Sequence, residues 1–357
     1  MNPRRKVSRI GFFWDRILEK KNLAGVPEKI SEKIPKRKPS KDKSRDSFWE
    51  YRDEPLKESQ HALDVLRSSV FSSGLRNVMV LLVLLAIVGA YATALWTLEN
   101  LIVPGVGILW RSIRLRKKSL RQRYGKWAVI TGATDGIGKG YAQQLAAKGM
   151  DLVLISRSKE KLVKVSQEIK AATGVEIKLI AVDFSHGVTV FDNIRAELES
   201  IDVGILVNNV GMVHSAGLFE NVTVQTHLQV INVNILSTLL MTHIVLPKMK
   251  IAGRGIIINI SSGTAEFPAP YITSYAASKS YGHNLTLALQ EELRGTGVEC
   301  QLVVPGFVRT NMTSTWPLWS IGGMLMPDAN QFCASATWLI GKTDNTSGHW
   351  YQALWVS

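Results

Sequence analysis

The sequence predicts an α/β protein built on a doubly wound parallel sheet of about seven strands, preceded by a transmembrane helix and a disordered basic tail. Three observations indicate this fold class. From Trp127 onward, short apolar segments alternate with amphipathic ones. A glycine-rich turn follows the first apolar segment, at 132–138. An uncharged apolar run lies upstream, from Asn77 to Leu98.

Charge divides the chain into a basic appendage and a neutral domain. The 357 residues carry a formal charge of +14. Residues 1–123 hold 26 Lys and Arg against 12 Asp and Glu, and residues 124–357 hold 17 of each kind. A neutral domain argues against nucleic-acid binding. We therefore divide the chain into a basic, largely disordered tail (1–76), a membrane anchor with a basic juxtamembrane segment (77–123) and a folded domain (124–357).

The tail and the anchor differ in apolar content. Residues 1–60 include the basic stretch Lys33–Lys41 and few apolar side chains to bury, so they are expected to be disordered. The run Asn77–Leu98 is long enough to cross a bilayer, which takes about 20 apolar residues in a helix. A buried core helix is the alternative interpretation of this run. We expect a transmembrane helix, because buried helices are usually shorter.

The charge of the segment after the predicted anchor indicates on which side of the membrane the C-terminal domain lies. Leu101–Trp110 is too short to span and contains Pro104, so we expect it at the interface or as the return arm of a shallow hairpin. A basic cluster follows, made of Arg111–Lys118 with Arg121 and Arg123. Eight Lys and Arg lie between 99 and 126, against three between 57 and 76. This bias places the C-terminal domain in the cytosol.

The folded domain is expected to alternate strands and helices. The predicted strands are 127–131, 151–156, 177–183, 203–208, 255–261, 298–304 and 348–354. The predicted helices are 137–149, 159–172, 190–200, 225–250, 272–294 and 328–341. The two cysteines, Cys300 and Cys333, have no metal or redox spacing, and the seven histidines are scattered. We therefore predict neither a disulfide framework nor a metal site.

The first strand-to-helix turn has the composition of a nucleotide-binding turn in a Rossmann-type sheet. Gly132, Gly136 and Gly138 follow an apolar strand and open a helix. Glycine permits a tight turn and lets a pyrophosphate approach the amides at the helix N-terminus. The candidate cofactor-binding residues in this turn are Gly132, Thr134, Asp135, Gly136, Ile137 and Gly138. A plain glycine-rich turn is the alternative.

The ends of the next strands indicate which cofactor binds. The second strand is followed by Arg157, where an acidic residue would favour NAD and a basic one accommodates the 2′-phosphate of NADP. We therefore predict NADP(H), with an ordinary surface arginine as the alternative. Asp183 ends the third strand and is positioned to accept a hydrogen bond from the adenine. Asn209 follows the fourth strand, where the cofactor's ribose is expected.

Tyr275 and Lys279 carry the predicted chemistry. They stand four residues apart in a predicted helix, so both side chains project from one face. A free phenol titrates near about 10, and a neighbouring ammonium is expected to lower that pKa toward the working range. Ser262, after the fifth strand, is placed to hydrogen-bond a substrate carbonyl, and Asn234 to hold a relay water. A chance helical pair of Tyr275 and Lys279 is the alternative, and the order of the other motifs argues against it.

From about residue 125 to 354 the chain resembles the short-chain dehydrogenase/reductase family. The resemblance rests on the glycine turn Thr131–Gly138, on Asn208–Gly211, on the residues Asn234, Ser262, Tyr275 and Lys279, and on the stretch Pro305–Thr310. It implies hydride transfer from a nicotinamide to a ketone carbon. Tyr275 would protonate the oxygen, Lys279 would hold the nicotinamide ribose, Ser262 would position the carbonyl and Asn234 would order the relay water. Pro305 and Val308 are added as cofactor-binding residues.

Within that family the chain most resembles the membrane-anchored branch of 17β-hydroxysteroid dehydrogenases and very-long-chain 3-oxoacyl-CoA reductases. The branch implies an endoplasmic reticulum membrane and a lipid-like ketone substrate. Our first hypothesis is 3-oxoacyl-CoA reduction beside the fatty-acid elongation enzymes, and the second is a ketosteroid or sterol-type reductase. A membrane-anchored binding protein without turnover is the third.

An apolar segment at 307–327 and two long apolar helices bear on the substrate and on assembly. The segment contains Phe307, Met312, Trp316, Leu318, Trp319, Ile321, Met324, Leu325 and Met326, with Gly322 and Gly323 as hinges. We interpret it as a substrate lid, with membrane or subunit packing as the alternative. Helices 225–250 and 272–294 favour a homodimer.

Overall fold

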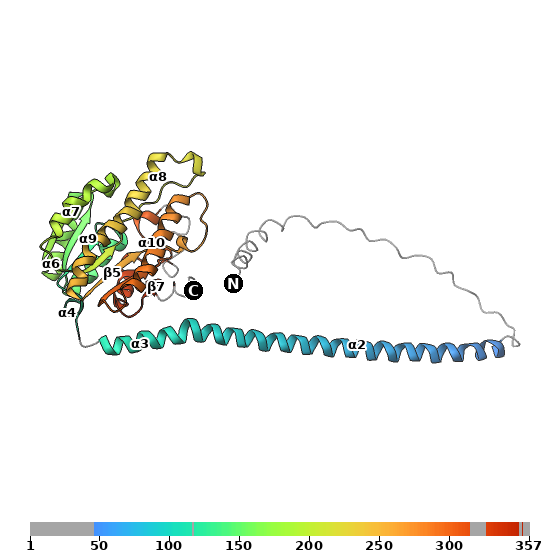
Figure 1. Ribbon diagram of the computed structural model, residues 1–357. Coiled ribbons are helices and arrows are strands. Elements are labelled where there is room, and N and C mark those ends of the chain that lie inside the picture. The colour runs from blue at the N-terminus through green and yellow to red at the C-terminus, as the bar shows by residue number, and fades with distance from the viewer. Residues whose placement is uncertain (1–45, 116–117, 315–325, 350–351, 353–357) are drawn as a thin grey trace. The chain divides into compact units, whose positions relative to one another are not determined.

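The computed structural model describes residues 46–115, 118–314, 326–349 and 352 (Figure 1). The chain divides into two compact units, 1–86 and 87–357. The first 45 residues of the predicted tail, the segment 315–325 of the predicted lid and most of the predicted strand 348–354 lie outside the described residues.

Helix α2 extends over Asp46–Thr97. Residues 46–60, expected to be disordered, are therefore helical. Leu56, Lys57, Glu58 and Gln60 have high helix propensity and extend the apolar helix towards the N-terminus. The helix continues through a π-helical segment η3, Leu98–Ile102, into α3, Val103–Leu115. Thr97 and Val103 both have right-handed helical backbone, so no reversing turn separates the two apolar runs and the hairpin alternative is wrong.

Two helices among the described residues are long and apolar enough to cross a membrane, judged by length and composition alone. In Val224–Ala252, 44% of an apolar 18-residue stretch is buried within the fold. Met241, Val245 and Met249 of this helix belong to the core. That helix is therefore a core element. In Gly74–Thr97 none of the corresponding stretch is buried, which leaves this segment as the candidate membrane span.

The predicted parallel sheet is confirmed. Its strands are β1 Trp127–Thr131, β2 Asp151–Ser156, β3 Ile177–Ala181, β4 Val203–Asn208, β5 Gly255–Ile260, β6 Val298–Val303 and β7 Asn345–Thr346. They lie in the order β3-β2-β1-β4-β5-β6-β7, and all neighbours pair in parallel. The strand order reverses between β1 and β4, where ligands bind in folds of this kind. The seventh strand was predicted at 348–354, but the residues paired with β6 are Asn345 and Thr346.

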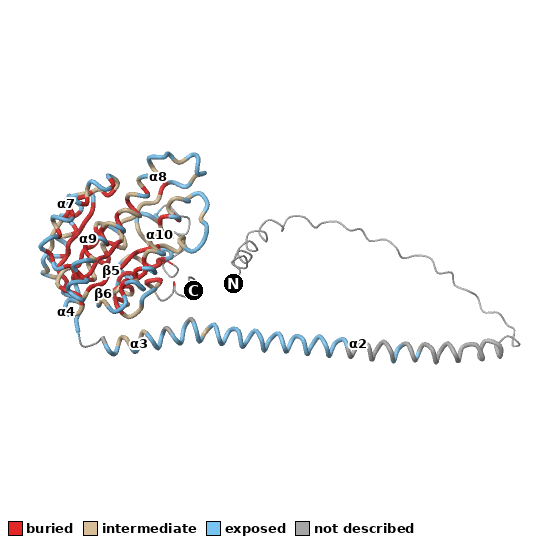
Figure 2. Tube along the Cα trace, viewed as in Figure 1, coloured by how far each residue is buried: buried red, intermediate tan, exposed pale blue. Residues whose placement is uncertain are grey.

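Helices cover both faces of the sheet, and the buried strands lie between them (Figure 2). One face packs on α5 (Gly136–Ala147), α6 (Lys159–Thr173) and α11 (Ala329–Trp338). The other packs on α7 (Phe191–Leu198), α9 (Ser237–Ala252) and α10 (Thr273–Glu292). Alternate residues of β1 divide between the two cores: Ala128 and Ile130 face the first, and Val129 faces the second.

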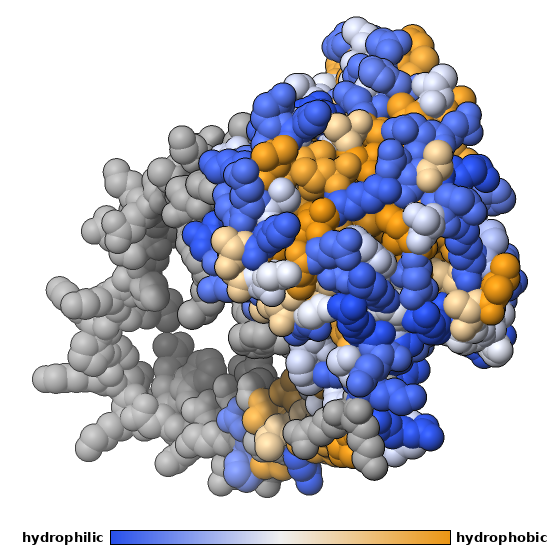
Figure 3. Space-filling view, turned by 90° about the vertical axis from the view of Figure 1, so that its left-hand side faces the viewer, coloured by the Kyte–Doolittle hydropathy of each residue, from blue (hydrophilic) through white to orange (hydrophobic). Residues whose placement is uncertain are grey.

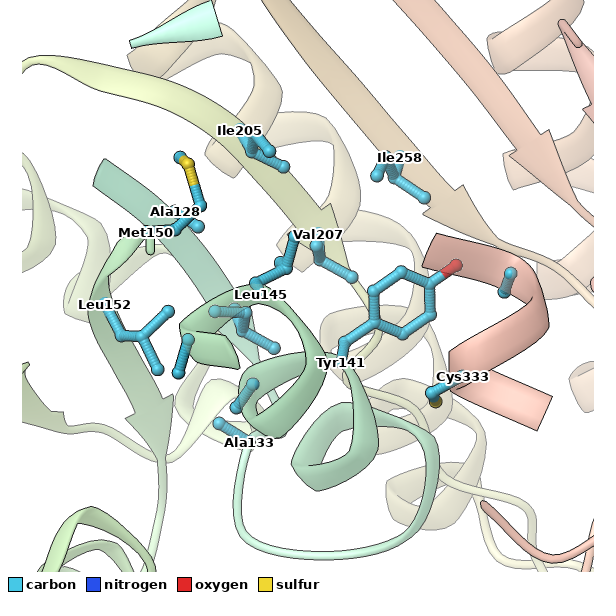
Figure 4. Packing of buried hydrophobic residues seen from close by; sticks show 14 of the residues in the cluster. Ala128, Ala133, Tyr141, Leu145, Met150, Leu152, Ile205, Val207, Ile258 and Cys333 are labelled. Carbon is cyan, nitrogen blue, oxygen red and sulfur yellow. The ribbon is translucent and has the colours of Figure 1, made fainter. Parts of the chain in front are cut away.

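The first core fixes the position of α5, which follows the glycine turn. Tyr141 and Leu145 of α5 are fully buried and lie near Val207 of β4, with Cys333 of α11 beside Tyr141 (Figure 4). The Cys333 thiol contacts the Ile137 carbonyl at 3.3 Å. At Gly140, a Cβ would come within 2.6 Å of the Cys333 sulfur, so the glycine allows α5 and α11 to approach closely.

A short helix, α4 (Leu120–Tyr124), joins the upstream segment to the sheet. Ser119 and Gln122 form a reciprocal capping box at its start. Tyr124 is 2% exposed, and its hydroxyl donates to Glu299 at the beginning of β6 (2.9 Å). Helix α4 therefore meets the domain at the amino edge of the sheet, opposite the edge at which the strands end.

Candidate active site

The glycine turn after β1 has a backbone that requires glycine. Gly132 and Gly136 have φ angles of 66° and 50°, in the left-handed region. A Cβ on Gly138 would collide with the Gly132 carbonyl oxygen and the Asn209 side chain. These three glycines were singled out in the sequence, and binding of a pyrophosphate at this turn stays a prediction.

The N-terminus of α5 is open to an anion. Asp135 is its N-cap residue but makes no side-chain hydrogen bond to the helix amides. Its carboxylate instead accepts from the Asn311 amide at 2.7 Å. The first amides of this twelve-residue helix therefore keep the partial positive charge that favours a phosphate.

Asn209 and Thr131 hold the turn in place. The Asn209 amide donates to the carbonyls of Thr131 (2.9 Å) and Gly132 (3.3 Å). The buried Thr131 hydroxyl accepts from the backbone amides of Asn209 and Val210, both at 3.0 Å. The structure thus shows Asn209 positioning the glycine turn, and its contact with the cofactor's ribose stays a prediction.

The candidate adenosine end lies beyond β2 and β3. Thr134 shares a hydrogen bond with Ser156 (2.9 Å), and the exposed Arg157 follows directly. Asp183 accepts from the Ser185 amide at 2.9 Å. Burial acts to raise the pKa of Asp183, but the hydrogen bonds from Ser185 and the nearby positive charge of Arg157 hold it below its usual range. The two predicted residues therefore face the same part of the sheet edge.

Ser262, Tyr275 and Lys279 come together at the carboxyl ends of β5 and β6. The Lys279 ammonium donates to the Ile260 carbonyl at 3.0 Å and lies 5.9 Å from the centre of the Tyr275 ring. Burial lowers the pKa of Lys279 to about 8. Burial also raises the pKa of Tyr275, and a hydrogen bond with Ser262 opposes that rise.

The pKa of Tyr275 corrects one expectation from the sequence. The ammonium was expected to lower this pKa, but it lies above its ordinary value because loss of water around the phenol outweighs the neighbouring groups. The Tyr275 phenol is therefore protonated at neutral pH, which is the form able to donate a proton to a carbonyl oxygen.

Asn234 joins the site to the loop after β4. It lies in a π-helical segment, η6 (Ile231–Leu236), between α8 (Val224–Val230) and α9. Its amide donates to the Met212 carbonyl (3.0 Å) and the Ser278 hydroxyl (2.8 Å), and its oxygen accepts from the Met212 amide (2.8 Å). Ser278 in turn donates to the Tyr275 carbonyl at 2.7 Å. Asn234 thus fixes the catalytic helix against this loop, and the relay water stays a prediction.

A backbone hydrogen bond joins the loops after β5 and β6. Pro305 accepts from the Gly263 amide at 3.0 Å, one residue beyond Ser262. Ser262 itself accepts from the hydroxyl of Thr264 at 3.0 Å. Val308 is 3% exposed and packs into the core, while Thr310 approaches Gly136 of the glycine turn. The loop after β6 therefore borders the predicted cofactor cradle.

The structure also brings together residues that the sequence did not single out. His214 and His227 lie with ring centres 6.1 Å apart, and His227 hydrogen-bonds Ser274, next to Tyr275, at 2.6 Å. The sequence showed only scattered histidines, because their proximity depends on how the loop after β4 folds back over α8. Among the described residues, no three His, Cys, Asp or Glu side chains lie close enough together to hold a metal ion.

Comparison with known families decides what this arrangement is. The family model described as short chain dehydrogenase matches residues 126–320, more than half of the chain. The chain belongs to the short-chain dehydrogenase family. Its members are oxidoreductases with a nicotinamide cofactor, which agrees with the glycine turn and the Tyr275–Lys279 pair.

Relatives within the short-chain dehydrogenases differ in stated activity. The very-long-chain 3-oxoacyl-CoA reductase of Homo sapiens is 42% identical over 233 residues, which is 64% of this chain and 73% of the relative. The inactive hydroxysteroid dehydrogenase-like protein 1 of Homo sapiens is 38% identical over 239 residues, covering 67% and 72%. A solved short-chain dehydrogenase from Sphingobium yanoikuyae in complex with NADPH is 27% identical with a TM-score of 0.56, covering 62% of this chain and 86% of that one.

Proposed function

We propose that this protein is a membrane-anchored, NADPH-dependent ketone reductase acting on a lipid-like substrate. The observation that carries the proposal is the meeting of Ser262, Tyr275 and Lys279 at the sheet edge onto which the glycine turn opens. The bound nicotinamide would supply the hydride to the carbonyl carbon. The chain's own residues supply orientation and the proton.

Each of these residues has a role that its surroundings favour. The protonated Tyr275 hydroxyl donates its proton to the carbonyl oxygen as negative charge develops there. Ser262, already a hydrogen-bond partner of Tyr275, orients the same oxygen. The Lys279 ammonium is held at the Ile260 carbonyl, where it binds the nicotinamide ribose and restores the tyrosine proton. Asn234 fixes the position of α10 through its hydrogen bond to Ser278, and it would order the relay water.

We assign NADP(H) rather than NAD to the cofactor site. Arg157 is exposed directly after β2, where a cation accommodates a 2′-phosphate, and no carboxylate occurs between it and Glu160. The similar Sphingobium structure contains NADPH. The remaining predicted cofactor residues, from the glycine turn to Asp183, Pro305 and Val308, line the same edge.

We assign membrane attachment to Gly74–Thr97, with the reductase domain in the cytosol. The run is apolar, exposed along its length and of spanning size. We place the protein in the endoplasmic reticulum, which suits a very-long-chain acyl reductase such as the human relative. Exposed apolar side chains on α8–α9 and α10, among them Leu228, Leu239 and Leu287, support a homodimer.

We rank three candidate activities. The first is reduction of 3-oxoacyl-CoA to 3-hydroxyacyl-CoA in fatty-acid elongation, supported by the name of a 42% identical relative. The second is reduction of a ketosteroid, supported by the exposed apolar side chains around the site, among them Leu218 and Phe267. The third is binding without turnover, as the name of the inactive relative suggests. The intact set of Asn234, Ser262, Tyr275 and Lys279 argues against the third.

The test is NADPH consumption by the detergent-solubilised protein with either substrate. Faster turnover of a long-chain 3-oxoacyl-CoA supports the elongation activity. Turnover of a 17-ketosteroid alone moves the protein to steroid metabolism. Binding of NADPH without turnover of either ketone contradicts the assignment as a reductase of these substrate classes.

A further inference from the structure

Two loops that border the substrate side of the site carry no cationic side chain. We call them the substrate rim: residues 213–223, after β4, and 263–272, after β5. They are joined by a hydrogen bond from the Gly217 amide to the Tyr271 carbonyl at 3.0 Å. His227, stacked on Phe219 of the rim at 4.6 Å, binds Ser274 beside the catalytic tyrosine. The rim therefore lies next to Ser274, the residue that precedes Tyr275.

The rim is apolar with two negative charges. Leu218, Phe219, Phe267 and Tyr271 are each more than half exposed. The charged residues of the rim are Glu220 and Glu266, both exposed. The lack of cations extends beyond it, since the sequence has no Lys or Arg at 196–247 or at 255–278. Apolar side chains also gather between polar ones over one face of the folded domain (Figure 3).

The cations of the domain are placed elsewhere. Lys248 and Arg254 are ion-paired with Glu199 and Asp202, at the amino edge of the sheet. Arg157 follows β2, on the cofactor side. Arg309, in the loop after β6, pairs by its backbone with Asp328. Its neighbours Thr310 and Asn311 contact the glycine turn, and Arg309 itself lies outside the rim.

This distribution bears on how a thioester substrate is recognised. The nucleotide part of coenzyme A carries a diphosphate and a 3′-phosphate, which proteins bind with arginine, lysine or helix N-termini. When a 3-oxoacyl chain places its ketone at Tyr275, the thioester lies two bonds from the reacting carbon. Since the rim follows Ser262 in the chain and ends beside Ser274, the coenzyme would leave the site across the rim. Its phosphates would there meet apolar side chains and two carboxylates.

We propose that the substrate rim recognises an uncharged apolar ketone and makes no phosphate-binding contact with a coenzyme A tail. This inference rests on the proposed reductase function and narrows its substrate class. It implies that the acyl chain and the ketone determine specificity. The protein should then reduce uncharged thioesters and other bulky lipid ketones with a kcat/KM similar to that for the CoA thioester.

The test compares two thioesters of one 3-oxoacyl chain, the CoA thioester and the uncharged N-acetylcysteamine thioester, with the solubilised full chain and saturating NADPH. We expect kcat/KM for the CoA thioester to exceed that for the uncharged one by less than about threefold, at low and at high salt. A kcat/KM ratio above this limit in favour of the CoA thioester overturns the inference. If that ratio falls as salt is added, the preference comes from phosphate binding. Turnover of neither ketone contradicts the reductase function itself.

A charge-reversal variant provides an independent readout. Glu266→Lys places a cation on the rim, and a single exposed ion pair with phosphate should raise the CoA-to-uncharged kcat/KM ratio roughly twofold to fivefold. Glu292→Lys makes the same charge change at the far end of α10 and is expected to leave the ratio unchanged. An unchanged ratio in Glu266→Lys would show that the coenzyme does not cross this rim, and would contradict the inference.

Discussion

At the scale of single residues, the protonation states of Tyr275 and Lys279 distinguish the site. Burial raises the pKa of the phenol and lowers that of the ammonium, so the two groups, whose proton affinities are similar in water, are driven apart. The spacing of Tyr275 and Lys279 was visible in the sequence, but the direction of the tyrosine shift was not. That direction depends on how much water the folded loops exclude, which no local pattern encodes.

Removing the Tyr275 hydroxyl should remove the proton donor and leave the fold in place. We expect Tyr275→Phe to lower kcat by roughly 10²- to 10⁴-fold, the usual contribution of a general acid. NADPH binding, followed by nicotinamide fluorescence, should persist. Tyr281→Phe changes a tyrosine six residues further along α10 and is the matched control. Unaltered turnover in Tyr275→Phe would show that another group donates the proton.

The low pKa of Lys279 predicts a pH limit on reduction. The ammonium form, which we propose binds the ribose and supports Tyr275, predominates below about pH 8 and is lost above it. Tyr275, with its raised pKa, stays protonated through this range. We expect kcat/KM for ketone reduction to fall as the pH rises through about 8. A profile that is level up to pH 10 would contradict the role given to Lys279.

In the proposed function, the choice between NADPH and NADH depends on Arg157. Arg157→Glu removes the cation for the 2′-phosphate and places a carboxylate where a ribose hydroxyl is bound. The ratio of kcat/KM with NADPH to that with NADH should fall by at least tenfold, since the change loses an ion pair and adds a repulsion. Arg195→Glu, on α7, supplies the control. If the ratio in Arg157→Glu equals that of the unchanged protein, the phosphate is bound elsewhere.

At the scale of elements, the glycine turn and the strands were predictable, and the departures have local causes. Six of the seven predicted strands begin at the residue where the structure places them. β7 is only two residues long, too short for any periodicity to identify. The helix predicted at 225–250 is interrupted by the π-helical turn that contains Asn234. Such a turn changes backbone hydrogen bonding without changing the apolar pattern, so the sequence shows one continuous helix.

Asn209 is a residue whose contacts depend on how the strands pair. From the sequence it was assigned to the cofactor's ribose because it follows a strand at the expected edge. In the structure its amide donates to the carbonyls of the turn after the adjacent strand β1, 77 and 78 residues earlier in the chain, and the contact with the ribose stays a prediction. Only the parallel pairing of β1 with β4 makes that contact possible.

Gly138 tests the link between the turn and cofactor binding. Gly138→Ala places a methyl group against the Gly132 carbonyl and the Asn209 amide, which forces the turn open. We expect NADPH affinity to fall by at least tenfold, measured by fluorescence titration. Gly282→Ala adds the same methyl group where nothing lies within 4 Å, in the middle of α10, and should be neutral or stabilising by up to about 1 kcal/mol. Equal affinities in the two variants would show that the turn does not hold the pyrophosphate.

At the scale of the whole molecule, part of the predicted juxtamembrane cluster belongs to the folded domain. Arg121 pairs with the buried Asp151 at 3.4 Å, and Arg123 with Glu299 at 2.5 Å. Both were counted in the basic juxtamembrane cluster that was used to predict the topology. Their sequence neighbours are basic throughout, so composition could not separate cations facing lipid from cations docked on the sheet.

The docked helix α4 predicts where the domain can be shortened. A chain that begins at Ser119 keeps the capping box and the buried Tyr124 and should remain folded without the candidate span. A chain that begins at Lys126 loses the burial of Tyr124 and should be less stable by about 3 kcal/mol or more. Urea unfolding of the two chains measures the difference. Equal stability would show that α4 contributes nothing to the domain.

The central claim is that this chain transfers hydride to a ketone with Tyr275 as proton donor. The most direct test supplies NADPH deuterated at C4 of the nicotinamide with a lipid-like 3-oxo substrate, and reads the product by mass spectrometry. We predict an alcohol with deuterium on the carbinol carbon from the unchanged protein, and roughly 10²- to 10⁴-fold slower formation of the same product by Tyr275→Phe. Formation of deuterated alcohol at equal rates by both proteins would contradict the role of Tyr275. Its absence from both, with NADPH bound, would contradict the reductase function.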